Sequence, residues 1–268
     1  MRRAVAIIGL LAGLIAGMAR AEDPAGCVML EPCTVGDRSY HVKPPDDWDG
    51  VTPLPVMLHF HGWMRQGTLI VRHMRISGAT RRRGVLLLAP NGQGKTWNFW
   101  TEDTPDIAFA DAVIEDAAKR WPIDRSRIFV SGYSYGSAMA WRYVCARGDS
   151  VYALLAVSGT LDQREECDEA PHHIRHVHGL RDRVMDFPMG PGGDTTYPVA
   201  LWRARKGCDG GKITGDWDVT RHDLFTRWVW GDCADGGSVT LDLHARGHFI
   251  PRGWIARQLD ELLDRPES

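Results

Sequence analysis

The sequence predicts an α/β fold in which a mostly parallel sheet carries helices on both faces. Short apolar runs that end at turn residues recur along the chain, for example at 56–60 and 85–89. Stretches with apolar residues at helical spacing alternate with these runs, as at 107–121. Strands that alternate with helices usually pair in parallel, and helices then cover both faces of the sheet.

The expected elements follow in a regular order. Strands are expected where short apolar or alternating runs are bounded by turn residues, at 38–43, 56–60, 85–89, 127–131, 152–157, 174–178 and 239–244. Helices are expected at 107–121, 137–146, 199–206 and 251–263. The glycine-, proline- and tryptophan-rich stretch 183–237 is expected to be an irregular insertion. Since the chain has no repeat and no linker-like segment, residues 22–268 are expected to form a single domain.

Composition excludes several classes of protein. Hydrophobic residues make up 44% of the chain and charged residues 25%, which is ordinary for a globular protein and excludes disorder. The formal net charge is −2, from 32 basic and 34 acidic residues, so no nucleic-acid partner is expected.

The first 21 residues have the pattern of a signal peptide. Two arginines precede a charge-free apolar run, and a small-x-small site follows at 19–21. An uncleaved anchor, or a lipoprotein attached at Cys27, is an alternative. No other segment is apolar enough to cross a membrane, so the mature chain is expected to be secreted, either to the periplasm or outside the cell.

Six cysteines remain after residue 21, and an even number in an exported chain favours disulfides. Fifteen pairings are possible. The order of the cysteines suggests a local scheme, in which each bridge closes a short loop: Cys27–Cys33, Cys145–Cys167 and Cys208–Cys233.

The segment 132–136 reads Gly-Tyr-Ser-Tyr-Gly and fits Gly-x-Ser-x-Gly. An apolar strand precedes it and a helix follows, which is the setting of a serine held on a sharp strand-to-helix turn. Glycines two residues before and after give that turn the space it needs. Ser134 is therefore the candidate nucleophile.

A nucleophilic serine needs a base, and the base needs an orienting acid. With this type of turn the acid follows the serine along the chain, and the histidine comes last. Asp182, which follows the strand at 174–178, is the candidate acid, with Asp186 as the alternative. His248, between the last strand and the last helix, is the candidate base, with His244 as its competitor.

Two backbone amides are expected to form the oxyanion hole. One belongs to Tyr135, directly after the nucleophile, and the other to the loop that follows the strand at 56–60. Gly62 lets that loop turn, so Trp63 is the expected donor, with Met64 as its neighbour and alternative. Trp97 and Trp100 are expected to line a substrate pocket.

Histidines cluster at 172, 173, 176 and 178. The alternation of a strand directs them to both faces, and no pair of carboxylates accompanies them at ligand spacing. The sequence therefore predicts neither a metal site nor a cofactor.

These motifs together resemble the secreted α/β-hydrolase esterases that include poly(3-hydroxybutyrate) depolymerase-like and feruloyl or acetyl-xylan esterase-like proteins. The resemblance runs from about residue 39 to the last helix. It is carried by the segments 53–55, 61–62, 106–130, 132–136, 178–182, 207–208 and 247–248, together with Cys145. The chain departs from the family at Tyr135 and Ser137, where the family has Asn and Gly. It departs again at 249–251, where Trp-Pro is usual.

The resemblance implies an α/β-hydrolase fold, a Ser-His-Asp triad, ester hydrolysis and no metal, and it supports the two later cysteine pairings. The expected function is a secreted serine esterase of the poly(3-hydroxybutyrate) depolymerase type. The expected partners are small esters or ester oligomers, with a polymer surface as the alternative. The alternative is a feruloyl or acetyl-xylan esterase. A serine peptidase and a non-catalytic binding protein on the same scaffold are weaker hypotheses. The chain is expected to be a monomer.

Overall fold

The structure is a computed structural model that describes residues 26–218 and 224–265. The signal peptide predicted at 1–21 lies outside the described residues. The strands form a single sheet in the order β1-β2-β4-β3-β5-β6-β7-β10-β9-β8. Their bounds are β1 (Cys33–Val35), β2 (Arg38–Lys43), β3 (Leu54–Phe60), β4 (Leu86–Pro90), β5 (Ile123–Tyr133), β6 (Ala153–Val157), β7 (His173–Gly179), β8 (Lys212–Asp218), β9 (Leu224–Trp230) and β10 (Ser238–His244).

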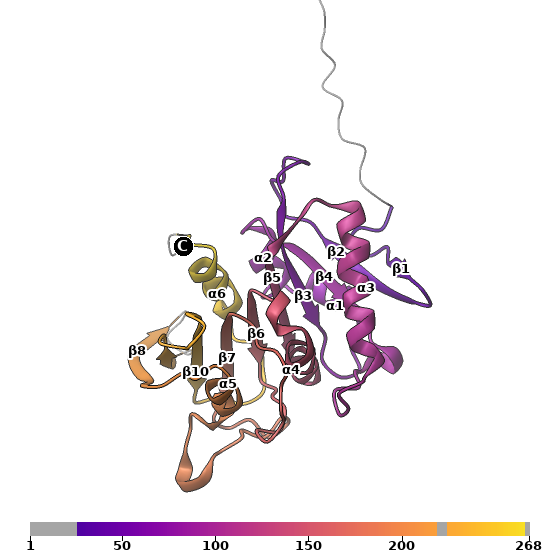
Figure 1. Ribbon diagram of the computed structural model, residues 1–268. Coiled ribbons are helices and arrows are strands. Elements are labelled where there is room, and N and C mark those ends of the chain that lie inside the picture. The colour runs from indigo at the N-terminus through magenta and orange to yellow at the C-terminus, as the bar shows by residue number, and fades with distance from the viewer. Residues whose placement is uncertain (1–25, 219–223, 266–268) are drawn as a thin grey trace, which may run out of the picture.

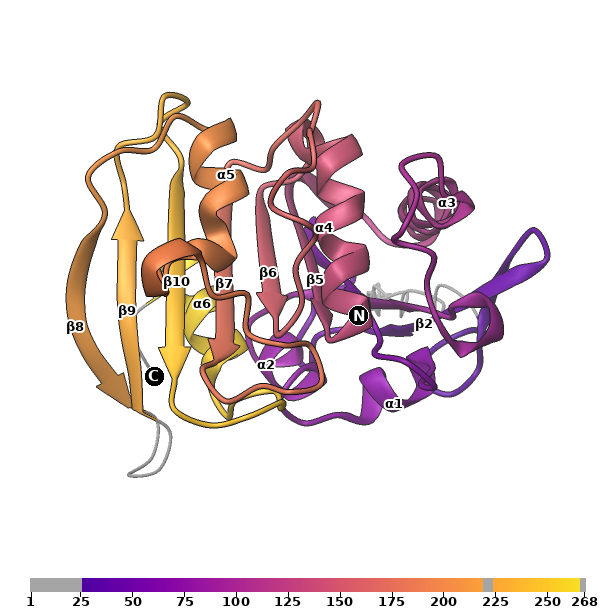
Figure 2. The same cartoon turned by 90° about the horizontal axis from the view of Figure 1, so that it is seen from below.

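The centre of the sheet is parallel and its two margins are antiparallel, as the α/β prediction requires. The strands from β4 across to β10 run parallel, while β1, β2 and β9 each run antiparallel to a neighbour. In Figure 2 the arrows of β6, β7 and β10 point one way and the arrow of β9 points the other. The carboxyl ends of the parallel strands therefore meet at one edge of the sheet.

Helices cover both faces of the sheet (Figures 1 and 2). One face carries α3 (Pro105–Arg120), α4 (Tyr135–Arg147) and α5 (Ala200–Arg205), and the other carries α1 (Gly67–Arg72), α2 (Ser77–Arg81) and α6 (Trp254–Leu262). Central strands supply both cores because side chains alternate along a strand. In β4, Leu86 and Leu88 face the α3/α4/α5 side, whereas Leu87 and Ala89 face the opposite side. Such strands read as continuous apolar runs, which is why their positions could be predicted.

The prediction that 183–237 is irregular is wrong. Besides α5, which is the helix expected at 199–206, this stretch contains the antiparallel pair β8 and β9. Most of β8 is exposed, and Gly215 marks a shift in its pairing register, so its sequence lacks the alternation of a half-buried strand. The helices α1 and α2 were also not predicted, because six and five residues are too few for a helical pattern to emerge.

A buried ionic cluster joins the late elements of the chain. The carboxylate of Asp242 on β10 accepts hydrogen bonds from the guanidinium of Arg227 on β9 at 2.8 and 2.9 Å. It also accepts the indole N–H groups of Trp217 on β8 at 2.9 Å and Trp254 on α6 at 2.7 Å. Because one carboxylate holds groups from three other elements, the β8–β9 pair and α6 are fixed to the sheet together.

Three disulfides pair all six cysteines: Cys27–Cys33, Cys145–Cys167 and Cys208–Cys233. This is the pairing that the order of the cysteines suggests. Cys208 and Cys233 lie on either side of the β8–β9 pair, and their Cα atoms are 4.0 Å apart.

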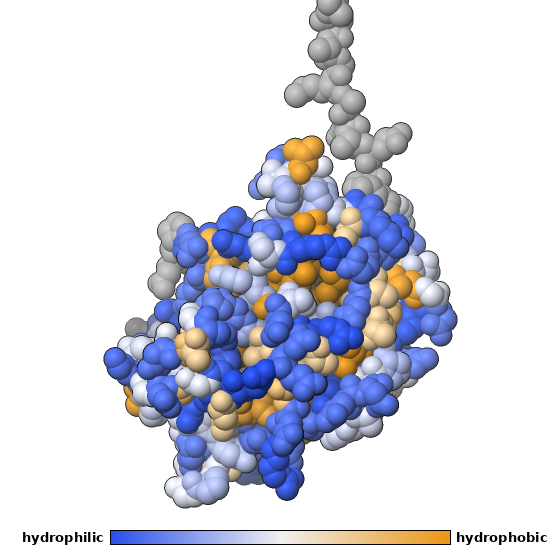
Figure 3. Space-filling model, viewed as in Figure 1, coloured by the Kyte–Doolittle hydropathy of each residue, from blue (hydrophilic) through white to orange (hydrophobic). Residues whose placement is uncertain are grey.

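The surface seen in Figure 3 is mainly hydrophilic, with small apolar patches between the polar side chains. Within the described residues, no helix has the length and apolar composition needed to cross a bilayer.

Candidate active site

Ser134 lies on a strained turn between β5, which ends at Tyr133, and α4, which begins at Tyr135. Its backbone has φ 59° and ψ −126°, a conformation that an L-residue seldom adopts. The surrounding chain fixes it, since its N–H donates to the carbonyl of Val157 at 3.0 Å. Such a turn lifts a serine hydroxyl to the carboxyl edge of the sheet.

The flanking glycines are required by packing. A Cβ on Gly132 would lie 2.0 Å from the carbonyl oxygen of Gly136, and a Cβ on Gly136 would lie 2.0 Å from that of Phe60. Both glycines of the Gly-x-Ser-x-Gly pattern therefore lie where two backbone segments pack too closely to admit a side chain.

The structure brings Asp182 and His248 together. Asp182 follows β7 and His248 follows β10, and these strands are parallel neighbours whose carboxyl ends adjoin. The Nδ1–H group of His248 donates to Oδ2 of Asp182 at 2.7 Å. The amides of Val184 and Met185 donate to Oδ1 at 2.9 and 3.1 Å.

The environment of Asp182 keeps it ionised. Burial on its own would raise the pKa of this carboxyl, but the hydrogen bonds from His248 and the two amides more than offset burial, so the pKa is lowered. A buried carboxylate that accepts the Nδ1–H of an imidazole fixes the tautomer of that imidazole, leaving Nε2 free to take a proton.

Ring stacking holds His248 beside the strained turn. The imidazole lies against the ring of Tyr133, with centroids 4.7 Å apart and an angle of 30° between the planes. The alternatives lie differently. His244 is buried on β10, where its Nδ1 accepts the N–H of Arg246, and Asp186 is an exposed residue beyond Asp182.

The loop after β3 lies against the nucleophile. A Cβ on Gly62 would be 3.6 Å from Cβ of Ser134. The carbonyl of Gly62 accepts the Nδ1–H of His61 at 2.8 Å and the N–H of Arg65 at 3.2 Å. In a trans peptide the N–H points away from the carbonyl, so these bonds fix the direction of the Trp63 amide.

The amide of Met64 is already engaged, because it donates to the carbonyl of Lys95 at 2.8 Å. Of the two donors considered from the sequence, Trp63 is therefore the available one.

His61 is a residue whose role the sequence did not reveal. Its Nε2 accepts the N–H of Gly92 at 3.0 Å while its Nδ1–H holds Gly62, so both ring nitrogens fix loop backbone. Burial lowers the pKa of His61 to about 4, which keeps the ring neutral and able to accept. The sequence feature that could have indicated this role is the histidine-glycine pair directly after the strand.

A pocket of about 280 Å³ opens beside the turn on the side of Tyr135. Trp100 forms one wall and is 69% exposed, with its ring edge-on to Tyr135 at 6.2 Å. The remaining lining comes from His178 on β7 and from the loops after β6 and β7: Gly159, Thr160, Val184, Met185 and Asp186.

Trp97 does not line this pocket. Its side chain is buried in the core, edge-on to Phe60 at 5.0 Å, and its indole N–H donates to the carbonyl of His61 at 2.7 Å. Trp97 thus stabilises the loop after β3 from the side of the core.

The clustered histidines pack within the fold. The Nε2–H of His178 donates to the carbonyl of Met185 at 2.9 Å, and Nδ1 of His178 lies 3.2 Å from Nε2 of His176. The sequence pattern gave no sign of this contact with the loop of Asp182. Among the described residues, no group of three or more His, Cys, Asp or Glu side chains is placed to hold a metal ion.

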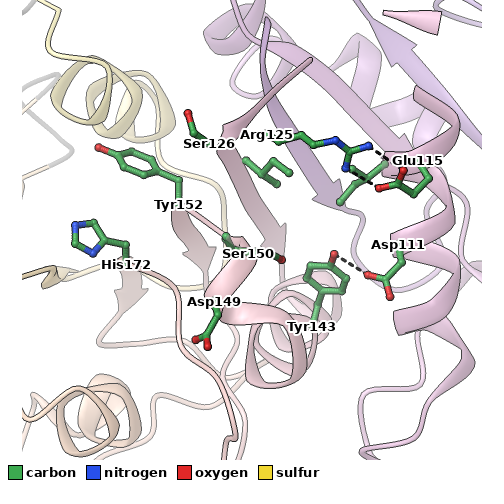
Figure 4. Close-up of a pocket in the computed structure, with 12 residues that line it drawn as sticks. Asp111, Glu115, Arg125, Ser126, Tyr143, Asp149, Ser150, Tyr152 and His172 are labelled. Carbon is green, nitrogen blue, oxygen red and sulfur yellow. Dashed lines mark hydrogen bonds and ion pairs between the residues drawn. The ribbon is translucent and has the colours of Figure 1, made fainter. Parts of the chain in front are cut away.

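A second hollow, of about 450 Å³, lies at the opposite edge of the sheet, where β5, β6 and β7 begin (Figure 4). Its polar groups are already paired in part. Figure 4 shows Arg125 bonded to Glu115 and Tyr143 bonded to Asp111. None of the site residues predicted from the sequence lines this hollow.

Comparison with known proteins found relatives and structural neighbours that are esterases. The chain is 27% identical over 231 residues to a probable feruloyl esterase C of Aspergillus niger, a match that covers 81% of this chain and 82% of the relative. It is 29% identical to feruloyl esterase C of Emericella nidulans, over 71% of this chain and 73% of the relative.

Among solved structures, an acetyl xylan esterase from Aspergillus awamori matches with a TM-score of 0.62 and 12% identity, over 85% of this chain and 94% of the other. At that identity the match shows the fold alone. No model of a known protein family matches the chain. The topology and the structural neighbours show an α/β-hydrolase fold, and together with the relatives they identify the chain as a carboxylic ester hydrolase that is similar to feruloyl esterases.

Proposed function

We propose that the chain is a serine esterase that uses Ser134, His248 and Asp182 as a catalytic triad and acts on esters of hydroxycinnamic acids such as ferulic acid. The observation that carries the proposal is the 2.7 Å hydrogen bond between His248 and a buried Asp182, next to a serine on a strained turn. This arrangement supplies a base with a fixed tautomer at the place where a nucleophile is exposed.

The reaction proceeds in two acyl transfers. His248 takes the proton of Ser134 as its Oγ attacks the ester carbonyl, and it passes that proton to the departing alcohol oxygen. Water then attacks the acyl-enzyme, giving one proton to His248, and the acid leaves as Ser134 regains its hydrogen. The amides of Trp63 and Tyr135 donate to the carbonyl oxygen while it carries negative charge.

The relatives favour the feruloyl esterase reading over the poly(3-hydroxybutyrate) depolymerase reading, since two of them are named feruloyl esterase C. The pocket beside Ser134 suits an aromatic acyl group, because Trp100 and Tyr135 offer ring surfaces against which a phenyl ring can pack.

Three disulfides support an extracellular or periplasmic location, since such bonds persist in oxidising compartments. Two further predictions accompany the proposal: the enzyme works as a monomer, and it does so after removal of residues 1–21.

The test uses the purified mature chain with its disulfides formed. The panel contains methyl ferulate, acetylated xylan, p-nitrophenyl acetate and butyrate, and 3-hydroxybutyrate oligomers, with Ser134→Ala as control. We expect methyl ferulate to give the highest kcat/KM and the Ser134→Ala variant to lose at least about 10³-fold in kcat. Hydrolysis that survives in Ser134→Ala would overturn the triad, and a preference for hydroxybutyrate oligomers would overturn the substrate class.

A further inference from the structure

Four arginines lie on loops near the candidate base, and we call them the arginine rim: Arg65, Arg181, Arg246 and Arg252. All four are exposed. They lie on the loops that leave the carboxyl ends of β3, β7 and β10, which are the loops that also carry Gly62, Asp182 and His248. A chain with a formal net charge of −2 thus collects positive charge at one place on its surface.

Contacts in the structure place three of these arginines near His248. The N–H of Arg181 donates to the carbonyl of Arg246 at 3.1 Å, two residues before the base. Arg65 lies near Tyr133, the residue that stacks on His248. Burial raises the pKa of Tyr133 to about 12, and the positive charge of Arg65 acts against that rise.

The rim lies on one side of Ser134 and the acyl pocket lies on the other. The ring of Tyr133 packs with the core between the sheet and helices α1, α2 and α6, whereas Tyr135 packs with the core on the α3/α4/α5 face. Arg65 lies two residues before the start of α1, and Arg252 lies two residues before the start of α6. Trp100 and the pocket belong to the Tyr135 side.

Acidic residues lie mainly on the pocket side. Asp186 lines the pocket, and Glu102 and Asp103 follow Trp100 in the neighbouring loop. The loops near His248 therefore carry the four arginines of the rim, whereas the loop that follows Trp100 carries two acidic residues. Within the described part of the chain, Arg65, Arg181 and Arg252 form no ion pair with a carboxylate, so their charge is not locally neutralised.

The chemistry decides which part of a substrate meets the rim. His248 has to reach the alcohol oxygen in order to protonate it as the ester bond breaks. The alcohol part must therefore lie on the Tyr133 side, against the rim, while the acyl part extends into the pocket beside Tyr135. A charge on the alcohol part would then lie within about one Debye length, roughly 8–10 Å, of several guanidinium groups.

We propose that the arginine rim selects esters whose alcohol part carries a carboxylate, such as a saccharide that contains a uronic acid. Guanidinium groups suit this task because they stay charged and can bind a carboxylate through two parallel hydrogen bonds. The rim also attracts an anionic substrate before contact, which raises the rate of productive encounter at low ionic strength. The inference rests on the triad and acyl pocket proposed above.

The test compares two substrates whose alcohol parts carry either a charged carboxylate or a neutral carboxamide at the same position. One is the ferulate ester of 4-hydroxybenzoate and the other is the ferulate ester of 4-hydroxybenzamide. We expect kcat/KM for the carboxylate ester to exceed that for the amide by about 10-fold in 20 mM salt, and the ratio to approach 1 in 500 mM salt. In a double variant with Arg65→Gln and Arg181→Gln, the low-salt ratio should fall to about 2.

Arg82→Gln is the matched control. Arg82 is an exposed arginine at the end of α2, at the opposite edge of the sheet, so its variant should keep the wild-type ratio. Three results would overturn the proposed role of the arginine rim. They are a wild-type ratio near or below 1, a ratio that does not change with salt, and a ratio that is unchanged in the double variant. Failure to hydrolyse either ester would instead count against the proposed function.

Discussion

Strain and charge at the site are concentrated in single residues that their neighbours hold in place. Ser134 keeps an unfavourable backbone conformation because Val157 and the two close-packed glycines leave it no other. Asp182 remains a buried anion because three N–H groups point at it. Ser134 and Asp182 therefore depend in part on contacts that the catalytic step itself does not use.

Asp182→Asn tests the assignment of the acid. The amide cannot accept Nδ1–H in the same way, so His248 loses its favoured tautomer, and kcat should fall by about 10³–10⁴-fold while the protein stays folded. Asp186→Asn is the comparison, because Asp186 is the alternative acid, and it should cost less than about tenfold. Steady-state kinetics on one ester, with melting temperatures for both variants, gives the answer. Equal losses in the two variants would remove Asp182 from its role.

His61 offers a graded test of the oxyanion hole. An asparagine at this position keeps a donor near the carbonyl of Gly62 but loses the acceptor for Gly92, whereas alanine loses both. We expect kcat to fall by about 10²-fold in His61→Ala and by clearly less in His61→Asn, with KM nearly unchanged, because an oxyanion donor acts mainly in the transition state. Equal losses in both variants would mean that the Gly62 contact does not orient the Trp63 amide.

At the scale of elements, the strand-to-helix turn is a junction of three backbones. β3, β5 and α4 meet where Gly132 and Gly136 stand, and neither position has room for one more carbon atom. The reactive turn is therefore also a packing contact of the fold.

Gly136→Ala should consequently destabilise the protein by about 3 kcal/mol or more, because the clash is with backbone that cannot swing aside. Gly231→Ala is the matched control, since a Cβ there meets no atom within 4 Å and its φ is not positive. Urea denaturation of both variants would measure the difference. Similar urea midpoints for the two variants would show that the backbone around the turn can shift enough to accommodate a methyl group at position 136.

Local patterns explain which elements could be predicted from the sequence. The central strands and α3 were foreseen because burial on one or both faces leaves a regular apolar pattern. The strand β8 was missed because its stability comes from pairing with β9 and from Trp217, which bonds to Asp242 on another strand. The two partners of that bond are 25 residues apart, too far for a local sequence pattern to include both.

The same limit applies to the site. Ser134, Asp182 and His248 could be named because each follows a recognisable strand, and the hydrogen bond between the last two forms as the chain order predicts. The contacts of His61 with Gly92, and of His178 with Met185, could not be foreseen, because they depend on how loops fold back on each other. Trp97 and Trp100 looked alike in sequence, yet one is a core residue and the other a surface residue.

At the scale of the whole molecule, buried histidines make stability depend on pH. Burial lowers the pKa of His59 to about 3 and of His61 to about 4. In the unfolded chain both would titrate near 6.5, so between pH 6.5 and about 4 the unfolded state binds protons that the folded state does not. The stability these neutral rings contribute is complete above pH 6.5 and is lost as the pH falls through that window.

We expect the free energy of unfolding to drop by about 4 kcal/mol between pH 7 and pH 5 from these two residues together. Urea denaturation at both pH values measures the change. His59→Gln removes one titrating group and should reduce the drop by about 2 kcal/mol. A free energy of unfolding that is the same at pH 7 and pH 5 would contradict the prediction.

The disulfide Cys208–Cys233 has a consequence for how this enzyme could diversify. Its two Cα atoms are 4.0 Å apart, so the chain enters and leaves the β8–β9 segment at nearly the same point. Such a segment is an interchangeable module, because a longer or shorter hairpin can be inserted between the two sulfurs without redirecting the rest of the chain. The exchange has one condition. Asp242 lies buried on the strand that receives the hairpin, so any replacement must bring a cation of its own to the position that Arg227 now holds.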